Sequence, residues 1–153
     1  KFLYWYQQLI AESLGKKNKG ILPVVSNAPK DHHSLLQLYL DGPEDKFFNI
    51  FSCEKNSKEK IFINKKLGVK SFINSKKLNF IKSAQRKALI KSFTKKKISF
   101  REIKITTANE KVLGKLFSLF MLETVIVGKL LNINPFDQPA VEQVKVYTKQ
   151  ILT

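Results

Sequence analysis

The spacing of apolar residues along the chain predicts a series of alternating helices and strands. Apolar positions recur at helical intervals in four long segments, which predict helices at residues 1–13, 77–95, 109–131 and 139–153. Short runs rich in β-branched and aromatic residues predict strands at 46–52, 60–66 and 98–105. Strands interleaved with helices are typical of an α/β layered architecture.

Local breaking and capping residues predict where several elements end. Gly15 is placed to stop the first helix. Residues 21–29 are expected to be extended, because two prolines and a β-branched pair disfavour a helix there. A further short helix is expected at 32–42, with Asp31 suited to cap its start and Gly42 at its end.

The composition is that of a folded protein. A chain of 153 residues with 43% hydrophobic and 11% aromatic residues is the size of one domain and can bury a core. We find no internal repeat and no clear domain boundary, so residues 1–153 are interpreted as one unit. Residue one is Lys1 and not methionine, which suggests a piece of a longer protein.

The strong positive charge raises the possibility of a nucleic-acid partner. The formal net charge is +16, but Arg86 and Arg101 are the only arginines, whereas phosphate and base recognition usually uses the planar guanidinium. The lysines are spread from Lys16 to Lys149 and do not gather on one helical face. The pattern favours a solvated lysine-rich surface, with a binder of nucleic acid or of an anionic membrane surface as the alternative.

Neither a membrane span nor a metal site is expected. The most apolar region, residues 112–133, is interrupted by Lys115, Glu123 and Lys129, which indicates a buried helix. The single cysteine, Cys53, excludes an intramolecular disulfide and fits a reducing cytoplasm. One cysteine and two histidines are also too few for a convincing metal centre.

Two segments in the first half of the chain carry side chains suited to proton transfer. Glu12 lies in the last turn of its helix, where unpaired carbonyls and any shielding would make its carboxylate a better general base. His32 and His33 lie at the start of the short helix, where only one of them can face inward, and a histidine moves protons near neutral pH. Taken alone, Glu12 is better explained as a surface glutamate before a glycine, and the histidines as residues at a helix start without a catalytic task.

A third segment, NPFDQPAVEQVK, lies before and within the last predicted helix. Pro139 is tolerated in the first turn of a helix, and Asp137 is suited to cap it. Gln138 and Lys145 are seven residues apart and so share one helical face, where an amide and an ammonium could hold an oxygen-rich ligand. Val141 and Val144 are then expected on the packed side. In isolation, a lysine on a final helix is usually only solvated.

Together, the segments ESLGK, DHHSLLQ and NPFDQPAVEQVK, in this order, closely resemble the C-terminal part of the glucose-6-phosphate isomerase family in its bacterial form. The family's patterns are a glutamate-serine-x-glycine-lysine, a histidine-serine segment and a phenylalanine-aspartate-glutamine-x-x-valine-glutamate-x-x-lysine helix. The matching positions span Trp5 to Lys145, whereas residues 52–100 carry little recognisable signature.

The resemblance implies a role for each matching residue. Glu12 would take a proton from C2 of the open-chain sugar phosphate and return it to C1 through a cis-enediol. His33 would help to open the sugar ring and, in a homodimer, would reach the neighbouring subunit's active site. Lys145 would serve ring opening and substrate contact, and Gln138 would bind the substrate. Such an enzyme interconverts glucose 6-phosphate and fructose 6-phosphate in glycolysis and gluconeogenesis, in the cytoplasm, without a cofactor.

The chain also departs from the family pattern. The family's phosphate-binding loop and an arginine near the intermediate lie upstream of this region, and Ala140 replaces a common glycine. The implied fold is the second sugar-isomerase (SIS) domain, a flavodoxin-like three-layer αβα sandwich that is incomplete in this chain. We therefore expect the isolated chain to be inactive. A sugar-phosphate-binding module that has lost catalysis is the main alternative.

Overall fold

A computed structural model describes residues 1–55, 73 and 75–153 of the chain. It is a mixed structure of helices with a small parallel sheet, which confirms an α/β fold. The chain divides into two compact units, one formed by residues 1–25 and 113–153 and the other by residues 26–112. The strand predicted at 60–66 lies outside the described residues.

The described elements follow the predicted order. They are α1 Phe2–Leu14, α2 Lys30–Ser34, α3 Leu36–Asp41, β1 Phe48–Lys55, α4 Leu78–Lys95, β2 Phe100–Thr107, α5 Glu110–Leu130 and α6 Pro139–Leu152. The four long predicted helices and two of the predicted strands are thus confirmed, with bounds that shift by up to three residues.

The short helix predicted at 32–42 differs from the prediction. It is divided at Leu35 into α2 and α3, and α2 already begins at Lys30. Asp31 therefore does not cap it, because Pro29 occupies the N-cap position and Asp31 lies within the first turn. Its carboxylate instead accepts a hydrogen bond from the backbone N–H of Asn27 at 2.5 Å. This contact spans the turn that leads from residue 27 into α2.

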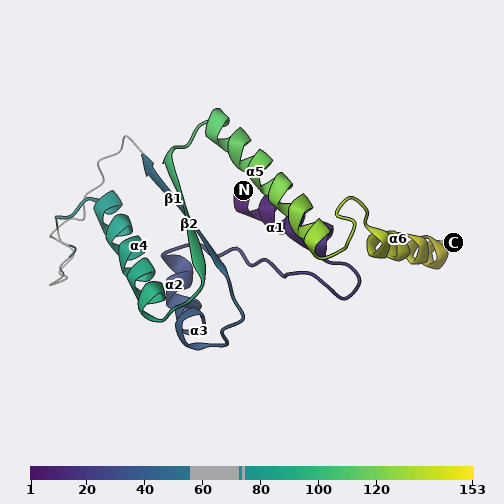
Figure 1. Ribbon diagram of the computed structural model, residues 1–153, viewed down its shortest axis with the longest axis horizontal. Coiled ribbons are helices and arrows are strands. Elements are labelled where there is room, and N and C mark those ends of the chain that lie inside the picture. The colour runs from purple at the N-terminus through teal and green to yellow at the C-terminus, as the bar shows by residue number, and fades with distance from the viewer. Residues whose placement is uncertain (56–72, 74) are drawn as a thin grey trace. The chain divides into compact units, whose positions relative to one another are not determined.

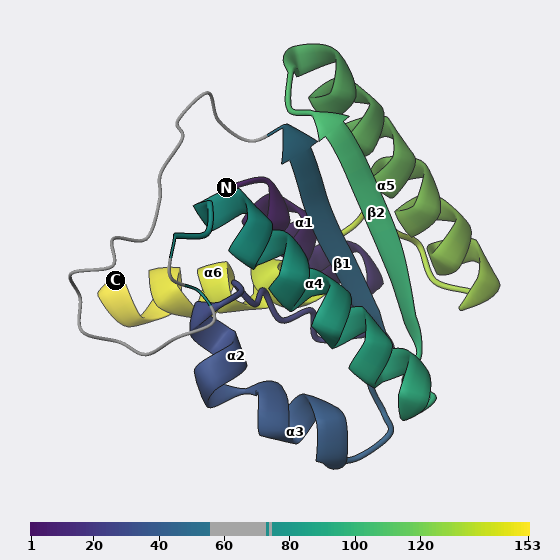
Figure 2. The same cartoon turned by 90° about the vertical axis from the view of Figure 1, so that its left-hand side faces the viewer.

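Residues 26–112 form a unit around the sheet. β1 and β2 are parallel, with Phe48 opposite Phe100, and α4 lies in the connection between them, as parallel strands require. Figure 2 shows α4 running along the pair of strands. Its Phe93 is 1% exposed and packs with ring-centroid distances of 4.7 Å to Phe48 and 5.8 Å to Phe100. This aromatic cluster fixes the helix on the sheet.

The second unit is built on the pairing of α1 with α5 (Figure 1). Trp5 and Phe117 meet edge to face at 4.3 Å, and Tyr6 lies 4.2 Å from the buried Phe120. Glu123, which interrupts the apolar sequence of α5, accepts a hydrogen bond from the Tyr6 hydroxyl at 3.3 Å. A charged residue is thus accommodated in the apolar helix by a polar partner on α1.

The turn after α5 completes this core. Ile133 packs with Ile10 and Leu14 of α1, and Leu14 is fully buried. The end of α1, which carries Glu12, is therefore anchored directly against the segment that leads to α6. Within the part of the chain that the structure describes, no helix is both long and apolar enough to cross a membrane.

Helix α6 begins at Pro139 as predicted, but its predicted packing is wrong. Val141 and Val144 are 46% and 64% exposed, and no residue of this fully described helix is buried. Its apolar residues have the spacing of a packed face, yet nothing in the same unit covers that face. A sequence pattern indicates which side of a helix could pack, but it does not supply the surface against which it packs.

Candidate active site

Glu12 lies in the last turn of α1, as the sequence predicts, and its side chain is exposed. The helix ends immediately afterwards at Gly15, where a Cβ atom would lie only 2.7 Å from the carbonyl oxygen of Ala11. Glycine therefore permits the sharp exit of the chain from the helix. Within the unit formed by residues 1–25 and 113–153, the side chain of Glu12 is not shielded from solvent.

Both carboxylate oxygens of Glu12 accept hydrogen bonds from glutamine amides. Gln8, one helical turn earlier, donates to Oε1 at 2.9 Å. Gln138, which is 126 residues away in the sequence, donates to Oε2 at 3.1 Å. The structure thus brings together two of the residues that the sequence singled out. Sequence reasoning missed Gln8, although its four-residue spacing from Glu12 on one helix was a usable signal.

Gln138 is not on the helical face expected for it. It occupies the N-cap position of α6, with φ −142° and ψ 58°, so it lies just outside the helix. Its side chain makes no cap hydrogen bond, because its amide is directed to Glu12. Gln138 thus lies just before the helix on which a shared face with Lys145 was predicted, and its partner, Glu12, comes from α1.

Asp137 does not cap α6, which corrects another sequence expectation. Its carboxylate instead forms an ion pair with Lys16, at 3.0 Å from Nζ to Oδ1. The hydrogen bond from Lys16 holds the pKa of Asp137 below its ordinary value, a direction that partial desolvation opposes and a hydrogen bond from Asn134 reinforces. The expected contact of Asp137 with the start of α6 is thus replaced by a contact with Lys16, which is distant in the sequence.

The loop after α1 carries two lysines whose role the sequence analysis did not identify. Besides Asp137, Lys16 Nζ donates to the carbonyl of Asn134 at 2.7 Å, and Lys19 Nζ donates to the carbonyl of Leu131 at 2.6 Å. The loop closes on itself through backbone hydrogen bonds between Lys16 and Lys19. The available signal was the placement of both lysines between Gly15 and Gly20.

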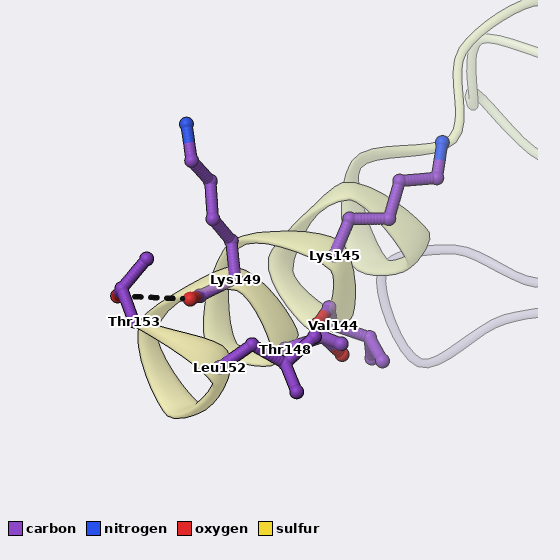
Figure 3. A pocket seen from close by; sticks show the side chains of 6 residues that line it. All are labelled: Val144, Lys145, Thr148, Lys149, Leu152 and Thr153. Carbon is purple, nitrogen blue, oxygen red and sulfur yellow. Dashed lines mark hydrogen bonds between the residues drawn. The ribbon is translucent and has the colours of Figure 1, made fainter.

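Lys145 does not contact Glu12 in this structure. It forms an exposed ion pair with Glu142, three residues earlier on α6, at 2.5 Å. In Figure 3, Lys145 and Lys149 extend to one side of α6, and Val144 and Leu152 lie on the other. A shallow, mostly apolar hollow of about 400 Å³ is lined by Val144, Lys145, Thr148, Lys149, Leu152 and Thr153.

His33 lies in α2, within the other unit of the chain. Its side chain is exposed, whereas that of His32 is half-buried. The expectation that only one of the two faces inward agrees with this difference, but a relationship between His33 and Glu12 stays a prediction. Among the residues that the structure describes, no group of three histidine, cysteine or acidic side chains could hold a metal ion.

Comparisons with known proteins place these motifs in context. No family model matches the chain. It is 36% identical over 145 residues to the glucose-6-phosphate isomerase of Methanocaldococcus jannaschii, covering 92% of this chain and 35% of that protein. It is 34% identical over 152 residues to a probable glucose-6-phosphate isomerase of Methanococcus maripaludis, covering 99% of this chain and 34% of that protein. The glucose-6-phosphate isomerase of Campylobacter jejuni is 34% identical over 157 residues, covering 99% of this chain and 38% of that protein.

A solved structure shares the fold. The crystal structure of a hypothetical protein from Thermus thermophilus matches with a TM-score of 0.87 and 29% identity. The match covers 98% of this chain and 38% of that chain. The chain thus spans about a third of the length of the curated relatives that it matches. The resemblance found in the sequence is confirmed at the level of a similarity to one part of these isomerases.

Proposed function

We propose that this chain is the C-terminal part of a glucose-6-phosphate isomerase and contributes its catalytic base. The observation that carries the proposal is the hydrogen bond between Gln138 and Glu12, at 3.1 Å. It joins two sequence motifs that resemble the same family and lie at opposite ends of the chain. The similarity to curated isomerases over 92–99% of the chain supports the same conclusion.

The chemistry of the reaction suits these residue types. In the aldose, a base removes the proton on C2, the electrons of the C–H bond form a C1–C2 double bond, and the carbonyl oxygen takes up a proton to give a cis-enediol. The same carboxylate then returns its proton to C1 as the C2 hydroxyl loses its own, which gives the ketose. A single carboxylate can serve two adjacent carbons without a metal, provided that it is held in place. In this chain, Gln8 and Gln138 hold both oxygens of Glu12.

The other groups of the proposed site lie outside the contacts between Glu12 and its two glutamines. Lys145 would have to leave Glu142 to meet the substrate, and an exposed pair of this kind opposes such a move only weakly. His33 would act on the active site of a second subunit in a homodimer. Phosphate anchoring would come from upstream sequence, within an αβα sugar-isomerase domain of which this chain supplies one part. We therefore expect the isolated chain to be inactive.

The product of the complete open reading frame provides the test. We would measure conversion of fructose 6-phosphate to glucose 6-phosphate by the wild type, by Glu12→Gln and by Glu44→Gln, a control at an exposed loop glutamate. Loss of general-base catalysis should lower kcat by a factor on the order of a hundred or more in Glu12→Gln alone. Equal activity of Glu12→Gln and wild type would exclude Glu12 as the base.

A non-catalytic sugar-phosphate-binding module is a second candidate. The observation in its favour is the exposed position of Lys145, paired with Glu142 and away from Glu12. A folded wild-type gene product that binds fructose 6-phosphate in calorimetry, yet never isomerises it, would establish this alternative.

A further inference from the structure

The side chain of Lys16 is largely covered, although this lysine lies on a surface loop. Its side chain is 9% exposed, whereas the side chain of its partner Asp137 is 53% exposed. Lysine is rarely covered to this extent unless its ammonium is paired. Here the ammonium has two oxygen partners, the Asn134 carbonyl at 2.7 Å and the Asp137 carboxylate at 3.0 Å.

The partners of Lys16 and of Glu12 are adjacent residues. Glu12 and Lys16 lie on either side of Gly15 at the end of α1, and they contact Gln138 and Asp137 respectively. Two side-by-side contacts therefore join the end of α1 to the start of α6. A single contact would leave the backbone at Gln138 free to rotate. Two contacts to successive residues fix the direction in which the Gln138 side chain points.

Other described contacts hold the turn before Gln138, but none of them reaches Gln138 itself. Pro135 lies close to Gly128 of α5, and the Asn134 side chain accepts a hydrogen bond from the backbone N–H of Phe136 at 3.1 Å. The Gln138 side chain makes no cap hydrogen bond, and α6 beyond it buries no residue. Phe136, on the other side of Asp137, is 80% exposed. The contacts of this turn with α1 and its following loop are the packing of Ile133, the bonds of Lys16 to Asn134 and Asp137, and the bond of Gln138 to Glu12.

We propose that Lys16 is a positioning residue, which holds the 134–138 turn so that the Gln138 amide meets the Glu12 carboxylate. The proposal rests on the proposed function, because it assigns Lys16 a part in aligning the base of the isomerase reaction. Lys16 itself would touch neither substrate nor reacting atoms. Small displacements of a catalytic group lower rates steeply, which is why such a support affects turnover.

Kinetics of the complete gene product give the first test. Lys16→Met should lower kcat/KM by a factor on the order of a hundred, Lys16→Arg should recover most of it, and Lys17→Met, at an exposed neighbour, should match wild type. If Lys16 acts through Gln138, adding Lys16→Met to Gln138→Met should cause no further loss. Losses that multiply in the double variant, or wild-type kinetics in Lys16→Met, would overturn the proposal.

A second measurement does not depend on activity. With ¹⁵N-labelled glutamine, the side-chain amide of Gln138 is assigned by its absence in Gln138→Met. Its chemical shift and hydrogen-exchange protection should change in Lys16→Met and stay unchanged in Lys17→Met. An unchanged amide signal in Lys16→Met would refute the positioning role.

These two measurements separate the proposals. A wild type without isomerase activity refutes the proposed function, and the amide signal of Gln138 then decides the role of Lys16. Should Lys16→Met fail to fold, Asp137→Asn replaces it, because this variant weakens the ion pair and keeps the lysine. A normal Gln138 amide signal with normal kinetics in Asp137→Asn would then count against the proposal.

Discussion

Arg86 of α4 donates a hydrogen bond to Glu102 of β2 at 2.7 Å, and the same nitrogen donates to Ser52 of β1 at 2.8 Å. One guanidinium therefore connects the helix to both strands of the sheet. The two charged side chains are only 22% and 16% exposed, so the pair is shielded more than an ordinary surface ion pair.

Removal of this guanidinium should loosen the sheet. Among the described residues, Arg86→Met leaves Glu102 with only the longer pair to Lys104, at 3.4 Å, and should cost about 1–3 kcal/mol in local stability. Hydrogen exchange of the β2 amides, followed by mass spectrometry, would detect the loss as faster exchange. Lys87→Met, at the exposed next residue, serves as the control. Unchanged exchange in Arg86→Met would show that the pair is structurally neutral.

The ion pair of Lys16 and Asp137 makes a pH-dependent contribution to stability. The folded-state pKa of Asp137 lies below its unfolded value, because Lys16 donates to the ionised form. Such a group stabilises the fold above its unfolded pKa, and the contribution is lost as the pH falls through the folded pKa. The stability difference between wild type and Asp137→Asn should therefore be constant near neutral pH and vanish in acid. Denaturant unfolding at a series of pH values measures it, and a difference that persists unchanged into strong acid would contradict the assignment.

The end of α1 depends on a small apolar core. Leu14→Ala removes a fully buried side chain next to Ile10 and Ile133 and should cost about 2–5 kcal/mol. Because Leu14 follows Glu12 by two residues, the proposed isomerase activity should fall as well. Thermal unfolding and kinetics of the complete gene product check both effects. Leu22→Ala, at a position that is 83% exposed, should change neither by a measurable amount.

The lysine excess predicts only nonspecific attraction to nucleic acid. Duplex DNA should bind at low salt through counterion release, and the Kd at physiological salt should be weak, on the order of 10⁻⁴ to 10⁻⁶ M. Titration of a labelled duplex at several salt concentrations gives both the Kd and its salt dependence. Tight and sequence-dependent binding at physiological salt would favour the nucleic-acid alternative over the isomerase.

The sequence predicted the elements of this fold better than their contacts. The helical spacing of apolar residues predicted α5 and α6, and Gly15 ends α1 as expected. Such signals are local, because hydrogen bonding and side-chain spacing within a few residues determine them. The split of the short helix at Leu35 was missed, since an apolar run gives the same local signal whether or not the helix is interrupted.

The candidate site was predicted in part for the same reason. Glu12 and Gln138 were identified from motifs, but their hydrogen bond joins segments 126 residues apart, and no periodicity encodes such a contact. For Asp137, the sequence predicted a local contact with the start of α6. In the structure, its carboxylate pairs instead with Lys16, which is distant in the sequence. The exposed Val144 illustrates the converse, an apolar face that nothing in the same unit covers.

The loop between Gly15 and Gly20 has a consequence for how its sequence can vary. Gly20 has a φ of +134°, and a Cβ there would lie 2.8 Å from the Cα of Gly15, so the two ends of the loop touch. Surface loops usually accept insertions and deletions. In this loop, one added or missing residue would carry Lys16 or Lys19 away from the carbonyls that they bind. We therefore expect this loop to tolerate neither an insertion nor a deletion.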